Sequence, residues 1–400
     1  MTKEFKDVDL DLLSRTIDDI FSLNELREKL KENRQLTIKF GADATAPFLH
    51  IGHAVNLWMM RHFQECGHKV IFLVGDFTTR IGDPSGKSKT RKVITQEEID
   101  ANAEEFIRQV GQVLLTDPKV FEVRRNSEWF DKMPTGEFLS IISLTTHAKL
   151  ISRDMFQKRL KNNHEIHTHE LIYPIIQGYD SVALKADIAM AGTDQLFNEL
   201  MGRFYQEKFD QKPQVVITSK ITPGIDGGEK QSKSLGNFIA LEDSPRDKFG
   251  KIMSIPDKLI IEYLKVYTEI DMQDISSLEK DLSDGKNPIE VKKILAKEVV
   301  RRYHGEEEAN NEKSWFESSF SKKEFPDDAP VVKVAEDSLS LLDLLIKCDS
   351  SVSKSEMRRL IKQNAISING EKHIDEDETI SIDKELQIQI GKKKWFKVKG

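Results

Sequence analysis

Two histidines separated by two residues stand where a strand-like run passes into a helical pattern. They belong to His50-Ile51-Gly52-His53, and side chains at positions i and i+3 share one face of a helix. The first turn of a helix attracts phosphate, because its N–H groups are unpaired and the helix dipole is positive there. Gly52 would let a ligand come close to the backbone. An isolated His-x-x-His motif is more often structural than functional. It is also a weak candidate for a metal site, because no third ligand at a matching spacing accompanies it.

Two lysine-rich loops offer further partners for a polyanion. The first, residues 83–92, contains Gly86-Lys87-Ser88 but lacks the earlier glycine of a P-loop, so we interpret it as a clamp that could close on a polyphosphate. The second, Lys230-Gln231-Ser232-Lys233-Ser234, has glycines on both sides, and its two lysines can converge on one anion. Either loop alone is typical of solvated surface. The two loops and the histidine pair are each suited to bind an anion. Their occurrence in one chain is most simply explained by a shared polyphosphate site.

The first half of the chain alternates strand-like runs with helical patterns, and these must position the three motifs. Helices are predicted over residues 50–66 and 96–115, and a third between the last two strands. One strand, residues 70–74, is continuously apolar, as expected for a strand covered on both faces. The strands are predicted near residues 36–40, 70–74, 120–123, 188–190 and 215–217. We therefore expect an open parallel α/β sheet whose ligands lie at the carboxyl ends of the strands.

The second half of the chain is organised differently. Residues 244–320 have apolar residues at helical spacing, and residues 325–330, with two prolines, favour a linker. A small α+β unit follows, with helices over 341–346 and 353–362 and strands near 366–368, 386–390 and 395–398.

Composition narrows the class of protein. The chain has 400 residues, 38% of them hydrophobic, which indicates a multidomain globular protein. No apolar run is long enough to span a membrane and the start lacks a signal-like core, so we expect a cytoplasmic protein. The net charge is −7, yet residues 341–400 hold 12 Lys/Arg against 10 Asp/Glu, so the C-terminal part is the locally basic one. Its predicted helix carries a basic stripe suited to RNA phosphates, composed of Lys354, Arg358 and Lys362 with Arg359 beside it.

At this point the chain resembles the class I aminoacyl-tRNA synthetases, and within them the bacterial tyrosyl-tRNA synthetases. The resemblance covers nearly the whole chain and includes an S-four-type RNA-binding tail. Besides the histidine and lysine motifs, it is carried by residues 41–47, 81–87, 173–180, 192–195 and 353–361. It implies a Rossmann-like parallel-sheet catalytic domain over residues 1–225, a lysine loop with an α-helical domain over 226–322, a linker over 323–338 and the S-four-type domain over 339–400.

Such an enzyme activates tyrosine with ATP and transfers it to tRNA(Tyr). The tyrosine carboxylate attacks the α-phosphorus of ATP, so the protein needs donors aimed at growing charge rather than a nucleophile. Candidate catalytic residues, acting on the phosphates together with Mg²⁺, are His50, His53, Lys87, Arg91, Lys230 and Lys233. The resemblance implies that the substrate ammonium is held by Asp83, Tyr173 and Gln177 and the phenolic hydroxyl by Asp180. It implies that the adenylate is held by Gly41, Asp43, Thr45, His50, Gly52, His53, Gly192, Asp194, Gln195 and Lys233, and that tRNA is bound by Lys354, Arg358, Arg359 and Lys362. It also implies a homodimer.

Several positions depart from the family pattern. Lys39 stands where many tyrosyl enzymes have a tyrosine, although one branch also has lysine there. Ala42, Ala44 and Ala191 lie close to the expected substrate pocket, and Gln231 replaces the usual methionine. These changes leave two alternatives open, namely a divergent paralogue that activates a tyrosine analogue and a synthetase-like RNA-binding protein. A tryptophanyl enzyme shares the fold and motifs, but the buried carboxylate expected at Asp180 suits a phenol better.

Overall fold

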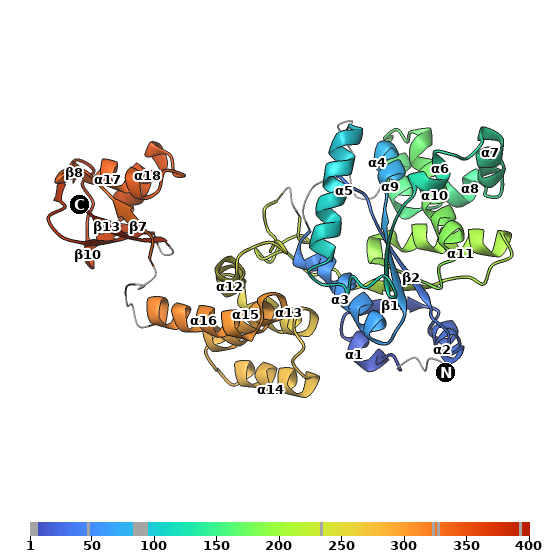
Figure 1. Cartoon of the computed structure of the whole chain (residues 1–400), viewed down its shortest axis with the longest axis horizontal. Helices are drawn as coiled ribbons and strands as arrows, with labels where there is room; N and C mark the ends of the chain where they lie inside the picture. The colour runs from blue at the N-terminus through green and yellow to red at the C-terminus, as the bar shows by residue number, and fades with distance from the viewer. Residues whose placement is uncertain are drawn as a thin grey trace. The chain divides into compact units, whose positions relative to one another are not determined.

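A computed structural model describes residues 7–45, 49–82, 95–232, 235–321, 325, 329–391 and 394–400. Contacts between Cα atoms divide the chain into two compact units, Met1–Ala309 and Asn310–Gly400, whose elements are shown in Figure 1. The boundary expected near residue 225 lies inside the first unit. Within the described residues, no helix is both long and apolar enough to cross a membrane.

The first unit is built on a six-stranded sheet with the strand order β1-β6-β5-β2-β3-β4. Strands β2 to β6 are parallel, as predicted. The strands are β1 (Ile17–Phe21), β2 (Thr37–Ala42), β3 (Lys69–Val74), β4 (Phe121–Arg125), β5 (Ile188–Gly192) and β6 (Val215–Ser219).

The prediction of a purely parallel sheet is wrong at one edge, because β1 runs antiparallel to β6. The sequence of β1, Ile-Asp-Asp-Ile-Phe, lacks the continuous apolar run of a strand covered on both faces, and most of its residues are exposed or half-buried. In contrast, every residue of β6 is buried. A central strand is therefore visible in the sequence, whereas this edge strand is not.

Strands β2 and β5 separate soon after they pair. Their only paired positions are Ile38 with Ile188 and Lys39 with Ala189. Beyond Lys39, β2 continues to pair with β3 through Gly41 and Ala42. The strand order also reverses at this point, since β3 and β4 extend the sheet on one side of β2 and β5 and β6 on the other. Such a switch point leaves a crevice at the carboxyl ends of the strands.

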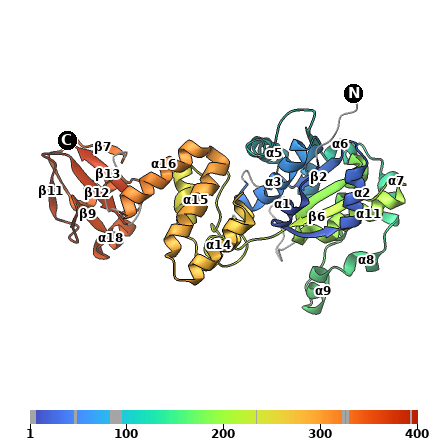
Figure 2. The same cartoon turned by 90° about the horizontal axis from the view of Figure 1, so that it is seen from below.

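Helices cover both faces of the sheet. Figure 1 shows α3 and α5 on one face and α10 and α11 on the other, and Figure 2 again shows α3 and α5 on the opposite side of the sheet from α11. Helix α5 ends at Val110, five residues earlier than predicted, and is followed by Gly111. The helices of this part are α1 (Leu10–Ser14), α2 (Leu23–Lys31), α3 (Ile51–Glu65), α4 (Asp76–Ile81), α5 (Gln96–Val110), α6 (Ser127–Phe130), α7 (Thr135–Ser143), α8 (His147–Ile151), α9 (Asp154–Lys161), α10 (Thr168–Leu184) and α11 (Leu196–Lys208).

Residues 244–320 are helical, as the apolar spacing predicted. Helix α15 buries one face against α12 and α13, and that face includes Val291, Leu295 and Val299. Helix α16 runs on into a short π-helical turn, Glu317–Ser321. The helices are α12 (Pro245–Met253), α13 (Ile260–Tyr267), α14 (Met272–Ser283), α15 (Pro288–His304) and α16 (Glu306–Phe316).

The second unit has its own apolar core beneath a five-stranded sheet of order β10-β9-β12-β13-β7. The same unit also contains a separate two-stranded sheet, in which β8 pairs antiparallel with β11. Residues 331–333 of the expected linker form β7, which pairs parallel with β13. The elements are β7 (Val331–Lys333), β8 (Ser338–Ser340), α17 (Leu341–Cys348), α18 (Lys354–Lys362), β9 (Ile366–Ile368), β10 (Glu371–Lys372), β11 (Thr379–Ser381), β12 (Leu386–Ile390) and β13 (Lys394–Lys399).

Candidate active site

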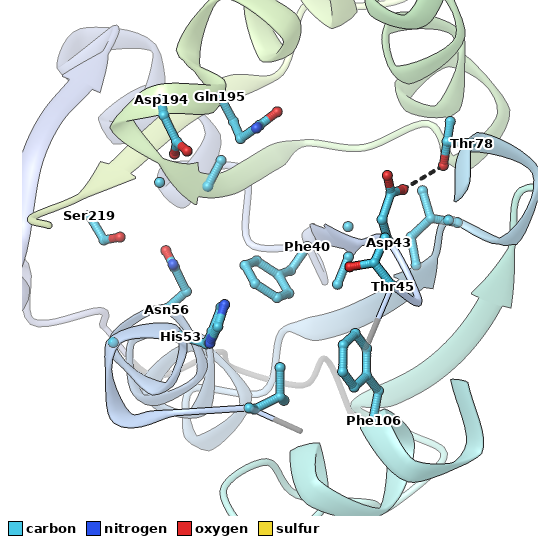
Figure 3. Close-up of a pocket in the computed structure, with 18 of the residues that line it drawn as sticks. Phe40, Asp43, Thr45, His53, Asn56, Thr78, Phe106, Asp194, Gln195 and Ser219 are labelled. Atoms are coloured by element: carbon cyan, nitrogen blue, oxygen red, sulfur yellow. Dashed lines mark hydrogen bonds between the residues drawn. The ribbon is translucent and has the colours of Figure 1, made fainter. Parts of the chain in front are cut away.

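A cavity of about 970 Å³ opens at the carboxyl ends of β2 and β5. Figure 3 shows His53 and Asn56 on one side of it, Asp194 and Gln195 on another, and Asp43 hydrogen-bonded to Thr78 on a third. Thirteen of the site residues predicted from the sequence line this cavity: Gly41, Asp43, Thr45, His50, Gly52, His53, Tyr173, Gln177, Asp180, Gly192, Asp194, Gln195 and Lys230.

The histidine pair lies at the N-terminus of α3. The backbone N–H of His50 donates to Nδ1 of His53 at 3.3 Å, and the two ring centroids are 3.8 Å apart. Because Nδ1 of His53 accepts this bond, the proton of the neutral ring sits on Nε2, which can then donate to a ligand. A Cβ at Gly52 would lie 2.9 Å from Nδ1 of His50, so the glycine leaves room for that ring. The absence of a side chain at Gly52 therefore makes room for the His50 ring, and not only for a ligand as the sequence suggested.

The segment that follows the lysine loop is joined to the histidine segment by backbone hydrogen bonds. The N–H of Ile51 donates to the carbonyl of Ile239 at 2.9 Å, and the N–H of Leu241 donates to the carbonyl of Leu49 at 3.0 Å. Gln231, which replaces the family's methionine, is buried and donates from Nε2 to the Tyr267 hydroxyl at 2.7 Å. Two motifs 180 residues apart in the sequence thus share one side of the cavity.

Lys230 reaches across to the loop after β5. Its Nζ lies 3.1 Å from Oδ2 of Asp194, and both side chains are about half exposed. An exposed pair of this kind contributes at most about 1 kcal/mol, so a polyphosphate can replace it readily. Gly192 leaves room for Asp194, because a Cβ there would lie 2.7 Å from Oδ1.

Asp43 and Tyr173 form one unit, although the resemblance gave them separate roles. The Tyr173 hydroxyl on α10 donates to Oδ2 of Asp43 at 3.0 Å, and Thr78 Oγ1 on α4 donates to Oδ1 at 2.7 Å. A Cβ at Gly75 would collide with both Asp43 and Thr78. The carboxylate of Asp43 is thus held in place by two hydroxyls that come from different helices.

Gln177 belongs to a hydrogen-bonded chain of three amides and one carboxylate, in which Asn198 and Glu199 are buried. Its Nε2 donates to Oε1 of Glu199 at 2.8 Å, and its Oε1 accepts from Nδ2 of Asn198 at 2.8 Å. Asn198 Nδ2 also donates to Oε1 of Gln195 at 2.9 Å. Because both ends of the Gln177 amide are fixed, its orientation in the cavity is set before any ligand arrives.

Asp180 is a buried carboxyl group, 2% exposed, on α10. Trp129 Nε1 donates to Oδ1 at 3.0 Å and Asn126 Nδ2 donates to Oδ2 at 3.4 Å. Burial raises the pKa of Asp180 to about 8, although the nearby Lys39 ammonium and the two donors act in the opposite direction. A buried acid of this kind can recognise a hydroxyl group at the end of an otherwise apolar substrate.

Lys39 is almost completely buried, at 1% exposure, on the same side of the sheet as α10 and α11. Its Nζ lies 2.8 Å from Oε2 of Glu199 and donates to Ser181 Oγ at 2.8 Å. Lys39 lines the cavity together with Asp180. The departure noted at this position therefore places an ammonium group inside the expected substrate pocket.

Sequence reasoning missed several residues that organise this cavity. Asn126 directly follows β4, and the rule that ligands gather at the carboxyl ends of strands could have found it. Trp129, Thr78, Asn198 and Glu199 lie on helices, and nothing in the local sequence distinguishes them from ordinary helical residues. Their roles become visible only once the helices are packed.

Some predicted site residues lie outside the described part of the chain. They are Asp83, Lys87, Arg91 and Lys233. Their assignments stay predictions.

The basic stripe predicted for tRNA lies on α18 of the second unit, with Met357 and Ile361 on the buried side. Each of its first three cations is at least half exposed and has a carboxylate nearby. The pairs are Lys354 with Asp343 at 3.9 Å, Arg358 with Glu376 at 2.5 Å and Arg359 with Glu356 at 2.5 Å. Lys362, in the last turn, is exposed.

Comparison with known proteins identifies the family. The model of tRNA synthetases class I (W and Y) matches residues 31–321, and that of the tyrosine-tRNA ligase SYY-like C-terminal domain matches residues 321–398. The chain belongs to the class I tRNA synthetases of this tryptophan and tyrosine group.

Curated relatives narrow the similarity to one kind of enzyme. A tyrosine-tRNA ligase of Thermotoga maritima is 42% identical over 390 residues, which are 97% of this chain and 96% of that protein. A tyrosine-tRNA ligase of Aquifex aeolicus is 43% identical over 95% of both chains.

Solved structures share the fold at lower identity. A truncated mitochondrial tyrosyl-tRNA synthetase of Aspergillus nidulans has a TM-score of 0.64 at 22% identity and covers 77% of this chain and 93% of its own. A tryptophanyl-tRNA synthetase of Encephalitozoon cuniculi bound to tryptophan has a TM-score of 0.59 at 16% identity. The match covers 78% of this chain and 95% of that one.

Proposed function

We infer that the chain is a tyrosine-tRNA ligase, which forms tyrosyl-adenylate and pyrophosphate from tyrosine and ATP and then transfers the tyrosyl group to tRNA(Tyr). One observation of the structure carries this inference. The buried carboxyl of Asp180, held by Trp129 and Asn126, lines the same cavity as His53 and Lys230. The cavity thus combines a hydroxyl-recognising group with donors for phosphate.

The relatives favour this function over the alternatives. Those of about 42% identity are tyrosine-tRNA ligases over nearly the whole chain, which argues against both a tyrosine-analogue enzyme and an RNA-binding protein without catalysis. The retained His50, His53 and Lys230 also speak for catalysis. Trp129 and Asn126 each donate to one oxygen of the Asp180 carboxyl group, which leaves that group suited to one further small polar partner. The phenolic hydroxyl of tyrosine is such a partner, whereas tryptophan offers the N–H of a larger indole ring.

The chemistry requires the protein to stabilise charge that develops on the phosphates. When the tyrosine carboxylate attacks the α-phosphorus, negative charge grows on the phosphate oxygens and on the departing pyrophosphate. The N–H of His53 Nε2, the His50 ring and the Lys230 ammonium supply donors on that side of the cavity, and we assign Lys87, Arg91 and Lys233 to the same task. Asp43 with Tyr173, and Gln177, would hold the amino acid and adenylate, with Asp83 joining at the ammonium.

Mg²⁺ would accompany ATP. Among the described residues, no cluster of three or more His, Cys, Asp or Glu side chains could hold a metal ion. Mg²⁺ in nucleotide sites is commonly bound through substrate phosphates with one or two carboxylates, and the half-exposed Asp194 fits the latter role. When bound, the ion would neutralise charge on the leaving pyrophosphate.

We propose that the second unit is an S-four-type domain that binds tRNA through α18. The ion pairs of Lys354, Arg358 and Arg359 are exposed, so phosphates can replace their carboxylate partners at little cost. Because tRNA charging serves translation, we also propose a cytoplasmic location.

A homodimer is the proposed assembly. Helix α7 and the turn after it expose Leu139 at 58% and Leu144 at 38%, next to the partly buried Ile142. A symmetric pair would cover such an apolar surface. Light scattering should give twice the 45.9 kDa chain mass; an active monomer would contradict the proposal.

The function is tested by ATP–pyrophosphate exchange with each of the twenty amino acids, followed by charging of tRNA(Tyr). Tyrosine should support exchange far better than any other amino acid. Exchange that depends on tryptophan, or none with any amino acid, would refute the inferred function.

A further inference from the structure

A side chain of the lysine loop is buried rather than solvated. Gln231 follows Lys230 directly, yet it is only 6% exposed and lines the cavity. A Cβ at Gly52 would lie 3.8 Å from Gln231 Nε2, so this amide packs against the first turn of α3. An amide that is buried away from water costs free energy unless its hydrogen bonds are made inside the protein. The partners of Gln231 therefore decide what it does.

Both ends of the Gln231 amide are bonded within the protein. Nε2 donates to the Tyr267 hydroxyl at 2.7 Å, and Oε1 accepts from the N–H of Ile239 at 3.4 Å. The carbonyl of Ile239 in turn accepts from the N–H of Ile51 at 2.9 Å. Because one end of the amide is a donor and the other an acceptor, these partners fix which way it points. Gln231 thus joins the lysine loop to α13 and, through Ile239, to the histidine segment.

The Tyr267 hydroxyl stands between two residues of the cavity wall. Tyr267 belongs to α13 and is 3% exposed, and its hydroxyl is hydrogen-bonded to Thr222 Oγ1 as well as to Gln231. Burial raises the pKa of Tyr267, so the hydroxyl keeps its proton. Since that hydroxyl accepts from Gln231, its own proton is directed to Thr222. Thr222 and Gln231 both line the cavity, and a single side chain of α13 holds them together.

A second tyrosine of α13 holds the same part of the chain. The Tyr263 hydroxyl donates to the carbonyl of Pro223 at 2.7 Å, and its ring lies edge-on to that of Tyr267 with the centroids 4.9 Å apart. Pro223 forms an antiparallel bridge with Lys230. From this bridge Lys230 reaches Oδ2 of Asp194 at 3.1 Å. The position of the Lys230 backbone is therefore set by α13, which belongs to the helical part of the chain.

Glutamine holds this place more firmly than the methionine that is usual in the family. A methionine side chain has three rotatable bonds and adapts to irregular surroundings without directional contacts. The Gln231 amide has two directional hydrogen bonds in a buried place, where such bonds are strong. The contribution of an ammonium group to catalysis depends on its placement, since an error of about 1 Å can lower a rate by about 100-fold. A fixed residue next to Lys230 is therefore useful for the reaction.

We propose that Gln231 and Tyr267 are positioning residues for adenylate formation. They hold the backbone of the lysine loop so that Lys230 faces the phosphates of ATP, and the helical part of the chain thereby supports the chemical step. This inference rests on the proposed function, and it deepens that function by naming groups that act without touching the reacting atoms. In that function, tyrosine is bound elsewhere in the cavity, by Asp180 and Gln177. Loss of the hydrogen bond should therefore change the rate and not the affinity for tyrosine.

The direct tests are Gln231→Met and Tyr267→Phe, each of which removes one side of the bond. The single-turnover rate constant of adenylate formation should fall by about 10- to 100-fold in both, and equilibrium binding of tyrosine should stay within about twofold of the unmodified enzyme. A single-turnover rate constant does not depend on the fraction of molecules that are folded, so it separates positioning from stability. Unchanged rate constants, or a loss of tyrosine affinity at an unchanged rate constant, would overturn the proposal.

The double variant, Gln231→Met with Tyr267→Phe, checks that the two residues act through one bond. It removes both partners of that bond and so leaves neither of them unpaired. Residues that act through a shared contact are not additive, so the double variant should be no slower than the slower single variant. Losses that multiply would show that the two residues act separately and would overturn the proposal.

Tyr205→Phe is the matched control, because it also removes one buried tyrosine hydroxyl. That hydroxyl donates to the carbonyl of Ile141 at 3.1 Å, and neither of these two described residues lines the cavity. The variant should lose stability to a similar extent and form adenylate at the rate of the unmodified enzyme. If it slowed adenylate formation as much as Tyr267→Phe, the effect would be a general loss of rigidity and the proposal would be wrong. Absence of any tyrosine-dependent exchange by the unmodified enzyme would instead refute the proposed function itself.

Discussion

Asp180 combines recognition with a cost in stability. Its carboxyl group is buried, and burial raises its pKa to about 8 from the ordinary value of 3.8. Between these two pH values the unfolded chain loses this proton while the folded chain keeps it. The free energy of unfolding therefore falls as the pH rises through this window, by up to about 1.4 kcal/mol per pH unit from this group.

Asp180→Asn removes this titration and should stabilise the protein. The midpoint of thermal unfolding should exceed that of the unmodified chain, and the difference should grow between pH 5 and pH 8, while selection of tyrosine is lost. Asp187→Asn is the control of opposite sign. Although burial works against it, the Arg34 guanidinium lowers the pKa of Asp187, so this variant should be less stable at pH 7, with a deficit that shrinks as the pH falls below about 4. A pH-independent gain in Asp180→Asn would contradict the account.

The packing of α10 against α11 is the element on which the cavity depends. Tyr173, Gln177 and Asp180 come from α10, and Glu199 comes from α11. The two helices can approach closely because Gly178 has no side chain. A Cβ at this position would lie 2.8 Å from Tyr205 and 3.1 Å from the backbone of Met201.

Gly178→Ala should therefore destabilise the protein by about 1–3 kcal/mol, since a backbone neighbour cannot move aside cheaply. It should also lower tyrosine-dependent exchange, because it displaces α10 relative to the sheet. Gly250→Ala in α12 is the matched control. Nothing lies within 4 Å of a Cβ there, so alanine should stabilise the helix by about 0.5–1 kcal/mol. Urea unfolding of both variants measures the difference, and equal stabilities would show that the contact at Gly178 is unimportant.

At this scale the sequence predicts some features and not others. The buried parallel strands were predicted because apolar runs such as residues 70–74 cannot be solvated. His50 was predicted from the spacing of the two histidines at a helix start, whereas Asp194 was implied only by the family resemblance. The pairing of Lys39 with Glu199 could not be predicted, because it joins a strand to a helix 160 residues later through the packing of α10 and α11. An edge strand such as β1 carries no comparable pattern.

The whole chain divides into a unit that contains the cavity and a unit that carries α18. If the second unit serves only to bind tRNA, the two half-reactions should depend on it differently. Removal of residues 323–400 should leave adenylate formation at the rate of the full chain and should strongly impair charging of tRNA. The charging efficiency of the full chain should fall as salt rises, with each phosphate contact contributing about one unit to the logarithmic slope. Unchanged charging by the truncated chain would refute RNA binding by the second unit.

The central claim is that opposite parts of one cavity perform different tasks, with His50 and His53 lowering the barrier and Asp180 selecting the amino acid. Pre-steady-state adenylate formation, measured with equilibrium tyrosine binding on His50→Ala and Asp180→Ala, tests this division most directly. His50→Ala should form adenylate about 10²–10³ times more slowly and bind tyrosine almost unchanged, as for the loss of a transition-state donor. Asp180→Ala should bind tyrosine weakly and relax selection against phenylalanine. The claim would be contradicted if His50→Ala lost tyrosine affinity while keeping the chemical rate of the unmodified enzyme.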